Sequence, residues 1–357
     1  MTDDKNPVPA ASSRAAAHNI RAADCVTAGA RGGYILAIMK RTITATLAFA
    51  FCILASAARP ARAQVSPAEV KPLAQRLGYP AGTKLLIVHA DDLAVSHSED
   101  AATEEAFTTG LVTSASIMVP CPWLTEIAAY ARAHPDADLG LHLTLTSEWA
   151  AYRWGGVLSK DKAPSLYDPS GYLYPTEMEA AAHIDVREAE AEIRAQIARA
   201  RSLGINPTHL DSHMGTLFQT RPLFEMLLRV GREERLPVLV SRESFASAPF
   251  LAADLGPDGI ALDHVVTIDP SVKPEDWPAY YEGVVKGLQP GVTELIIHLA
   301  HDDAEMRAIT ENHPNWGAAW RQRDFDYLTS ARFRKLLEEN GVRLTTWREI
   351  GKLIASR

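Results

Sequence analysis

The chain has 357 residues, a formal net charge of −8 and no block of basic residues. This charge balance argues against a nucleic-acid-binding protein, which would show a basic stripe or face, so we expect no nucleic-acid partner. A hydrophobic fraction of 47% and a charged fraction of 22% are typical of a globular protein that buries a core. The length fits one large α/β domain or two small ones.

The N-terminal segment has the layout of a secretory signal peptide. From Met39 the chain reads MKRTITATLAFAFCILASAARPARAQ: a short positive region, an apolar run, and small residues at a cleavage site before Gln64. The apolar run is short for a helix that spans a bilayer. We therefore expect residues 39–63 to be removed on export to the periplasm or the medium, leaving no stable membrane span. We expect residues 1–38 to be a non-native extension or a disordered tail; the alternative is a tail on a membrane-anchored protein.

From about residue 67 onward, short apolar runs alternate with longer amphipathic stretches. The runs that predict strands are Lys84–Ala90, Val112–Val119, Leu139–Leu145, Thr208–Leu210, Val238–Ser241, Leu295–Leu299 and Val342–Thr345. Among the stretches between them, Asp185–Leu203 predicts a helix that ends at Gly204.

Strands that alternate with helices and are almost continuously apolar indicate a parallel sheet covered on both faces. We predict an α/β fold for residues 64–357: a single-domain, incomplete (β/α) barrel of seven strands, of the TIM-barrel type. The segment at about 147–183, rich in Tyr, Trp, Pro and Gly, is predicted to be a long insertion in this barrel.

Histidine and aspartate residues stand at or near the carboxyl ends of four predicted strands. They are Asp91-Asp92, His142, His213 and His298. In a parallel barrel these ends converge on one face, so four separate strands are predicted to supply one site. Two histidines and one carboxylate, with positions left for water, form a familiar set for Zn²⁺ and similar divalent ions. Taken alone, the aspartate pair is equally consistent with the N-terminal cap of a helix over residues 98–107.

Four motifs follow one another along the chain: IVHADDLAVS, GLVTSASIMV, LGLHLTLT and PTHLDSHMG. Their order, their approximate spacing and the GLVTS segment resemble the YdjC/ChbG-like carbohydrate deacetylase family, which is related to the polysaccharide deacetylases. The resemblance covers about residues 84–303. It implies a (β/α) barrel, one divalent metal ion (Zn²⁺ or Mg²⁺), and hydrolysis of N-acetyl groups on chitin-type oligosaccharides or related amino sugars.

The resemblance also implies roles for individual residues. Asp92, His142 and His213 would be the metal ligands. Asp91 would be the general base that activates water, and His298, on the late strand, would be the general acid.

The sequence departs from the family pattern beside three of these positions. Leu93-Ala94 follow the aspartate pair where the family usually has Phe-Gly, and Met214-Gly215-Thr216 follow His213 where further histidines are usual. Leu299-Ala300-His301 follow His298 in place of Pro-Gly. The metal set is intact, so these differences bear on the substrate pocket, and a chitobiose-like substrate is not implied.

Three aromatic residues cluster in the insertion just after His142: Trp149, Tyr152 and Trp154. Flat aromatic faces suit sugar rings, so we predict contact with an N-acetylated carbohydrate substrate. The alternative is that the three rings anchor the insertion by burial.

Two further residues, His209 and Asp211, alternate with His213 along one strand and are predicted to orient the metal ligands; the alternative is core packing. For Arg321, in the helical stretch NWGAAWRQRDFDYL, a solvated helix face is favoured over a pairing with Asp91. We expect His89 to be structural. The segment 301–303 is either a support for the site or a polar loop.

Two other classes of protein remain open. A phosphoesterase or amidohydrolase on the same barrel would use a similar site, although a two-metal phosphoesterase needs additional bridging carboxylates, for which only residues 301–303 are spare. An exported sugar-binding protein that has lost catalysis would need neither the base nor the acid. The sequence leaves the exact sugar, the preferred ion and the assembly, monomer or homodimer, open.

Overall fold

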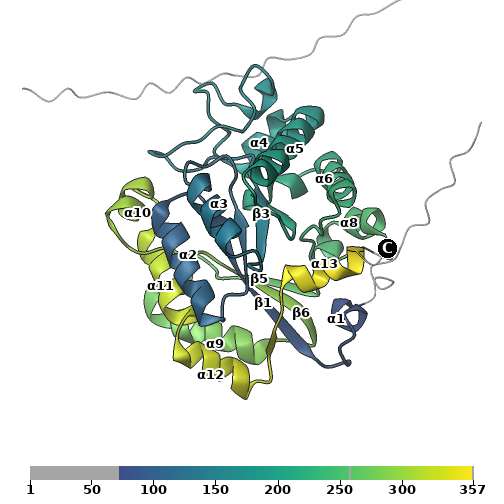
Figure 1. The fold of residues 1–357 in the computed structure, drawn as a ribbon, viewed down its shortest axis with the longest axis vertical. Helices are drawn as coiled ribbons and strands as arrows, with labels where there is room; N and C mark the ends of the chain where they lie inside the picture. The colour runs from purple at the N-terminus through teal and green to yellow at the C-terminus, as the bar shows by residue number, and fades with distance from the viewer. Residues whose placement is uncertain (1–71, 257–258, 356–357) are drawn as a thin grey trace, which may run out of the picture. The chain divides into compact units, whose positions relative to one another are not determined.

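The computed structural model describes residues 72–256 and 259–355, so the predicted signal peptide at 39–63 and the tail at 1–38 lie outside the described residues. The described chain forms one parallel sheet surrounded by helices (Figure 1). Its strands are β1 (Lys84–Leu93), β2 (Ser114–Ile117), β3 (Leu139–Leu143), β4 (Leu210–Ser212), β5 (His264–Thr267), β6 (Gly291–Ile297) and β7 (Arg343–Leu344). They lie in the order β4-β3-β2-β1-β6-β5, and β7 pairs with β1. The predicted α/β fold, an incomplete barrel of seven strands, is confirmed.

The sheet has two faces with different surroundings, because side chains alternate along each strand. On β1, Leu86 points into the main core, which the outer helices cover. Leu85, Ile87, His89 and Asp91 share the opposite face, which we call the inner face of the barrel. This face begins apolar and ends polar within a single strand.

The lower end of the inner face is apolar and covered. Leu85 and Ile87 belong to a small core with Leu262, Val292 and Trp347. Helices α1 and α13, at the two ends of the described chain, supply further members of this core. The polar groups at the other end of the inner face therefore lie above a closed apolar core.

Helices connect the strands and form the outer layer. They are α1 (Leu73–Arg76), α2 (His97–Thr109), α3 (Leu124–Ala133), α4 (Glu177–His183), α5 (Val186–Ser202), α6 (Arg221–Glu234), α7 (Ser244–Ser247), α8 (Pro249–Leu255), α9 (Trp277–Gly287), α10 (Ala304–Ile309), α11 (Ala318–Leu328), α12 (Ala331–Glu339) and α13 (Trp347–Ala355). In Figure 1, α2 lies beside α10, and α6 lies between α5 and α8. None of the helices in the described ranges is long and apolar enough to cross a membrane.

The predicted helix over Asp185–Leu203 is confirmed as α5. Asp185 caps it by accepting a hydrogen bond from the backbone N–H of Arg187 at 2.8 Å. Gly204, just after its end, has a φ of +85°, a conformation that glycine adopts without the Cβ clash of other residues. The predicted insertion contains α4 and a short 3₁₀ helix at Pro164–Leu166.

One predicted strand and one missed strand lie at the gap of the barrel. The segment Val238–Ser241 makes only isolated bridges, from Val238 to Leu210 and from Ser241 to Leu262, so the prediction of a regular strand there is wrong. It bridges β4 at one end and the residues just before β5 at the other, so it forms a ladder with neither. β5 itself, HVVT, is half-exposed and was not predicted because it is a short run without strong apolar character.

Candidate active site

The two aspartates at the end of β1 point to one centre. Side chains of successive strand residues normally leave on opposite faces, but Asp92 has a left-handed φ of +74° that breaks the alternation. Aspartate tolerates this conformation better than most residues. As a result, Asp91 Oδ2 and Asp92 Oδ1 lie 3.8 and 3.3 Å from the same nitrogen, Nε2 of His142. The helix-cap alternative is wrong, because Ser96 caps α2 instead.

Three predicted metal ligands, Asp92, His142 and His213, come together at this centre. Their ligand atoms all lie within 4.8 Å of one another, and all three side chains are buried. Asp92 Oδ1 lies 3.3 Å from His142 Nε2 and 3.4 Å from His213 Nδ1, and it is buried without a hydrogen bond. An orphaned carboxylate oxygen faced by two imidazole nitrogens is the arrangement that a divalent cation would complete.

The second oxygen of Asp92 is held by Arg321, whose Nη2 donates to Oδ2 at 2.8 Å. Arg321 is buried in α11 and also pairs with the buried Glu99 of α2. The expectation that Arg321 lies on a solvated helix face is therefore wrong. Burial alone would raise the pKa of Asp92, but the guanidinium charge together with the contacts of His142 and His213 outweighs it and keeps this pKa well below its ordinary range.

Each histidine of the set is fixed by a carboxylate on its other nitrogen. His142 Nδ1 lies 2.7 Å from Asp211 Oδ1, and His213 Nε2 lies 3.0 Å from Glu148 Oε2. Burial alone would lower the pKa of His213, but Glu148 and Asp92 together outweigh it and raise this pKa to about 9. Such carboxylate–histidine pairs set which ring nitrogen is available to an ion. Glu148 was missed by the sequence analysis, because it is a single acidic residue in the insertion with no motif around it.

The residues assigned as base and acid face each other across the centre. Asp91 Oδ1 accepts a hydrogen bond from Ser116 at 3.2 Å, while Oδ2 lies 4.0 Å from His298 Nε2. His298 follows β6, and its backbone N–H donates to Asp324 Oδ2 at 3.2 Å. Burial lowers the pKa of His298 to about 4, although the nearby Asp92 carboxylate opposes this shift. His298 is thus a neutral imidazole near pH 7.

The aromatic residues of the insertion form a wall behind His213. Trp149 and Trp154 are 3% and 4% exposed, and the Tyr152 hydroxyl donates to the carbonyl of Val95 at 2.7 Å. The Trp154 and His213 ring centroids are 6.3 Å apart. This burial favours the alternative in which the three rings anchor the insertion.

Two less buried apolar side chains lie near the histidines of the centre, Met214 beside His213 and Trp316 beside His298. Met214, next to His213, is 38% exposed. The half-buried Trp316 ring lies 6.4 Å from the ring of His298, measured between centroids. Neither residue was among those predicted to contact the substrate, and both are more exposed than the buried tryptophans of the insertion.

Two of the other predicted residues lie apart from the centre. His209 is buried lower on the inner face and stacks on Trp347, with ring centroids 4.8 Å apart. His301 Nε2 lies 3.6 Å from Glu105 on α2, and Asp303 caps α10. The segment 301–303 is therefore a polar loop and helix cap.

The chain is similar to a known protein family over most of its length. The family model described as YdjC-like protein matches residues 85–339 of this chain. The chain belongs to the YdjC-like family. Its YdjC-like relatives include a carbohydrate deacetylase from Thermus thermophilus, 34% identical over 287 residues that cover 78% of this chain and 97% of that protein.

Two further matches cover about three quarters of this chain. A carbohydrate deacetylase from Thermoanaerobacter pseudethanolicus is 27% identical and covers 74% of this chain and 98% of its own length. A crystal structure from Enterococcus faecalis V583, named for cellobiose-phosphate cleavage, has a TM-score of 0.64 and 26% identity, and covers 75% of this chain and 99% of its own.

Proposed function

We propose that this YdjC-like protein is a divalent-metal-dependent hydrolase that removes N-acetyl groups from amino sugars or their oligosaccharides. The observation that carries the proposal is the pairing of two carboxylates on one centre. Asp92 Oδ1 is free of hydrogen bonds beside His142 and His213, and Asp91 Oδ2 lies next to it. The relatives named carbohydrate deacetylase support the choice of substrate class.

Asp92, His142 and His213 would hold the ion. When bound, a divalent ion at this place polarises a carbonyl and lowers the pKa of a water. The protein's own residues then move the protons. Asp91 Oδ2 takes a proton from the water as its oxygen bonds to the acetamide carbon, and His298 gives a proton to the nitrogen as the C–N bond breaks. The products are acetate and a free amine.

The neutral state of His298 adds a condition to this mechanism. A pKa of about 4 leaves His298 without the proton that a general acid must donate near pH 7. The proton therefore has to come from within the site. Asp91 Oδ2 receives one from the attacking water and lies 4.0 Å from His298 Nε2, so one proton can serve both steps.

The alternative functions have less support. Two further groups of possible ligands lie nearby, but both depend on the same carboxylate, Asp211, and one of them shares His142 with the first set, so neither offers a separate pair of bridging carboxylates for a two-metal phosphoesterase. A sugar-binding protein without catalysis would have no use for the opposed Asp91 and His298.

The test is acetate release. The purified protein, stripped of metal with a chelator, is assayed on a panel of N-acetylated sugars with and without Zn²⁺, Mg²⁺ or Co²⁺, beside a His142→Ala/His213→Ala control. We expect an added ion to restore acetate release in the wild type and not in the control. Metal binding at the site without acetate release from any sugar would replace the acetyl-sugar assignment with another hydrolase class.

We also propose that the protein is exported and that the mature chain begins at Gln64. This rests on the signal-peptide layout of residues 39–63. Mass spectrometry of the protein recovered from the periplasm and medium of a bacterial host should show a chain that starts at Gln64. A chain that keeps residues 39–63 and sediments with membranes would contradict export by cleavage.

A further inference from the structure

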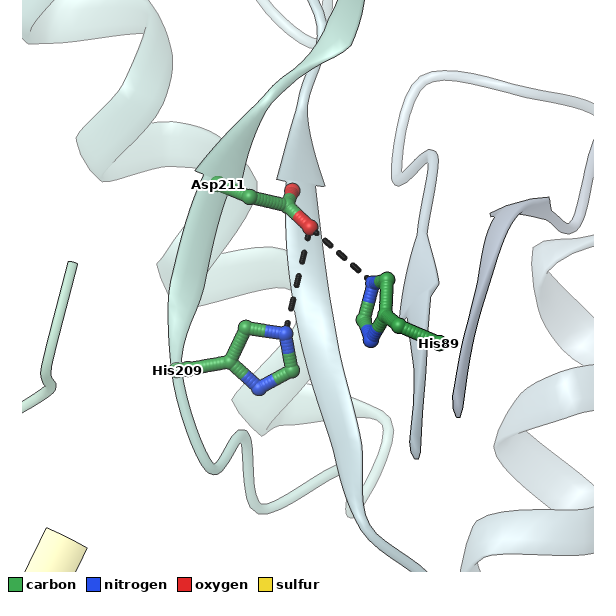
Figure 2. A group of neighbouring side chains, drawn as sticks. All are labelled: His89, His209 and Asp211. Atoms are coloured by element: carbon green, nitrogen blue, oxygen red, sulfur yellow. Dashed lines mark ion pairs between the residues drawn. The ribbon is translucent and has the colours of Figure 1, made fainter. Parts of the chain in front are cut away.

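Directly below the aspartate pair, the inner face carries a buried cluster made of His89, His209 and Asp211 (Figure 2). Both histidine rings point towards the Asp211 carboxylate, His89 from β1 and His209 from the residue before β4. Their side chains are completely buried, so neither can touch a substrate. Any influence of this cluster on the reaction must therefore pass through the residues above it.

Both ring nitrogens of His89 face hydrogen-bond acceptors. Nδ1 lies 2.9 Å from the hydroxyl oxygen of Ser114, and that hydroxyl gives its own proton to Asp138. Nε2 lies 3.1 Å from Asp91 Oδ1, 3.1 Å from Ser116 Oγ and 3.3 Å from Asp211 Oδ2. Nε2 faces two carboxylates and therefore donates; Nδ1 also donates when Ser114 gives its proton to Asp138, and His89 is then an imidazolium between two carboxylates.

The charge balance around His89 agrees with this geometry. Burial alone would lower the pKa of His89, but the surrounding carboxyl groups, with Asp211 and Asp91 in direct contact, outweigh it and raise this pKa well above its ordinary value. The neighbouring His209 behaves in the opposite way: burial lowers its pKa well below the ordinary value, and its Nε2 has no hydrogen bond. The two histidines of Figure 2 thus differ in charge.

The two carboxylate oxygens of Asp91 therefore have different neighbours. Oδ1 accepts a hydrogen bond from the Ser116 hydroxyl and lies 3.1 Å from His89 Nε2, which leaves Oδ2 to face the centre. Asp211 is divided in the same way, with Oδ1 on His142 and Oδ2 on His89. One imidazole therefore joins the base to the carboxylate that orients a metal ligand.

We infer that His89 is the positioning residue of the base: it anchors Asp91 Oδ1 from below and keeps Oδ2 aimed at the attacking water. This inference rests on the proposed function, in which Asp91 is the base. A divalent ion held by His89, His209 and Asp211 is the competing reading. It would require His89 Nε2 to lose its proton and its contacts with Asp91 and Ser116.

The test compares His89→Gln with a matched control. Glutamine keeps one donor but carries no charge, so kcat should fall about 10- to 100-fold, with a much smaller change in KM, because the base is misaimed while the sugar still binds. His209→Gln is the control: it makes the same substitution at an equally buried histidine of the same cluster, which stacks on Trp347 and lies 3.8 Å from Asp211 instead of beside Asp91. Its kcat should stay close to the wild-type value. An unchanged kcat in His89→Gln, or an equal loss in both variants, would overturn the inference.

Two further measurements separate this inference from the proposed function. The first is the ¹⁵N spectrum of histidine-labelled wild-type protein loaded with Zn²⁺, which needs no substrate. We expect both His89 nitrogens to be protonated, whether or not acetate is ever released; a His89 with one bare nitrogen overturns the inference. The second is the number of Zn²⁺ ions bound per chain. We expect one, retained in His89→Gln; two ions, one of them lost in that variant, would establish the competing ion site.

Discussion

The lower and upper halves of the barrel's inner face are built from the same strands but hold opposite kinds of side chain. On β1, Leu85 and Ile87 lie in a dry apolar core, and His89 and Asp91, only a few residues further on, lie among charged groups. In the lower half, burial itself supplies stabilisation. In the upper half, burial is costly for each charge, and the cost is met by a partner such as Arg321 on Asp92.

This division separates two kinds of damage that a substitution can do. A change in the lower half should weaken the fold and leave the chemistry of surviving molecules intact. A change in the upper half should remove chemistry and leave the fold, provided that the partners of the changed group stay satisfied. Each prediction below tests one side of the division.

The largest effect is expected from Asp91→Asn in the upper half. Asparagine keeps the shape and can still accept a hydrogen bond from Ser116, but it cannot take a proton from water. We expect kcat to fall about 10²- to 10⁴-fold, because that is the usual contribution of a positioned base. The metal content should not change, since Asp92, His142 and His213 are untouched.

Steady-state acetate release and metal analysis on the same preparation provide the measurement. An Asp91→Asn protein that turns over near the wild-type rate would remove Asp91 as the base. Loss of the ion together with activity would instead make Asp91 a metal ligand, which would erase the division of labour between the two aspartates.

The next largest effect is expected from Ile87→Ala in the lower half. Ile87 is completely buried between Leu85 and His89, and truncation leaves a cavity in a closed part of the barrel. We expect the free energy of unfolding to fall by about 2–5 kcal/mol. Urea unfolding measures this loss. The kcat of the folded protein, measured well below its melting temperature, should be unchanged; a matching loss of kcat would show that the halves are not independent.

The sequence predicted which residues meet at the centre better than it predicted the residues that surround them. Strand ends and motifs brought together Asp91, Asp92, His142, His213 and His298 because parallel strands deliver their ends to one place, a rule that needs only strand order. The predicted carboxylate support of His142 by Asp211 is also present, since the two residues are paired in register on β3 and β4.

What the sequence could not supply are contacts between distant segments. Arg321 reaches Asp92 across 229 positions of the chain. The one signal for it is that Arg321 shares a buried helix face with Ala318 and Leu328, a spacing that favours the interior. Glu148 gave no such signal. The left-handed φ of Asp92, which turns both aspartates to one centre, lies where the register of β1 with β2 shifts, between Ala90 and Leu93, and the sequence carries no signal of this irregularity.

The smallest effect, and the sharpest test of the boundary between the halves, comes from Glu294 on β6. Its Oε2 accepts a hydrogen bond from Trp347 at 2.8 Å, and burial raises its pKa from 4.5 to about 8. The folded state therefore holds a proton that the unfolded chain releases between these values. This contribution to stability is complete below pH 4.5 and is lost as the pH rises towards 8, by at most about 1.4 kcal/mol per pH unit.

Glu294→Gln removes this loss, because glutamine stays neutral at every pH. In urea unfolding of the metal-free proteins, the stability of the variant relative to the wild type should rise steadily across that pH window. A constant difference would mean that Glu294 is ionised in the fold and shares the positive charge of His89. Glu294 would then balance the charge of His89 together with Asp91 and Asp211. The charged half of the inner face would in that case extend down to Glu294.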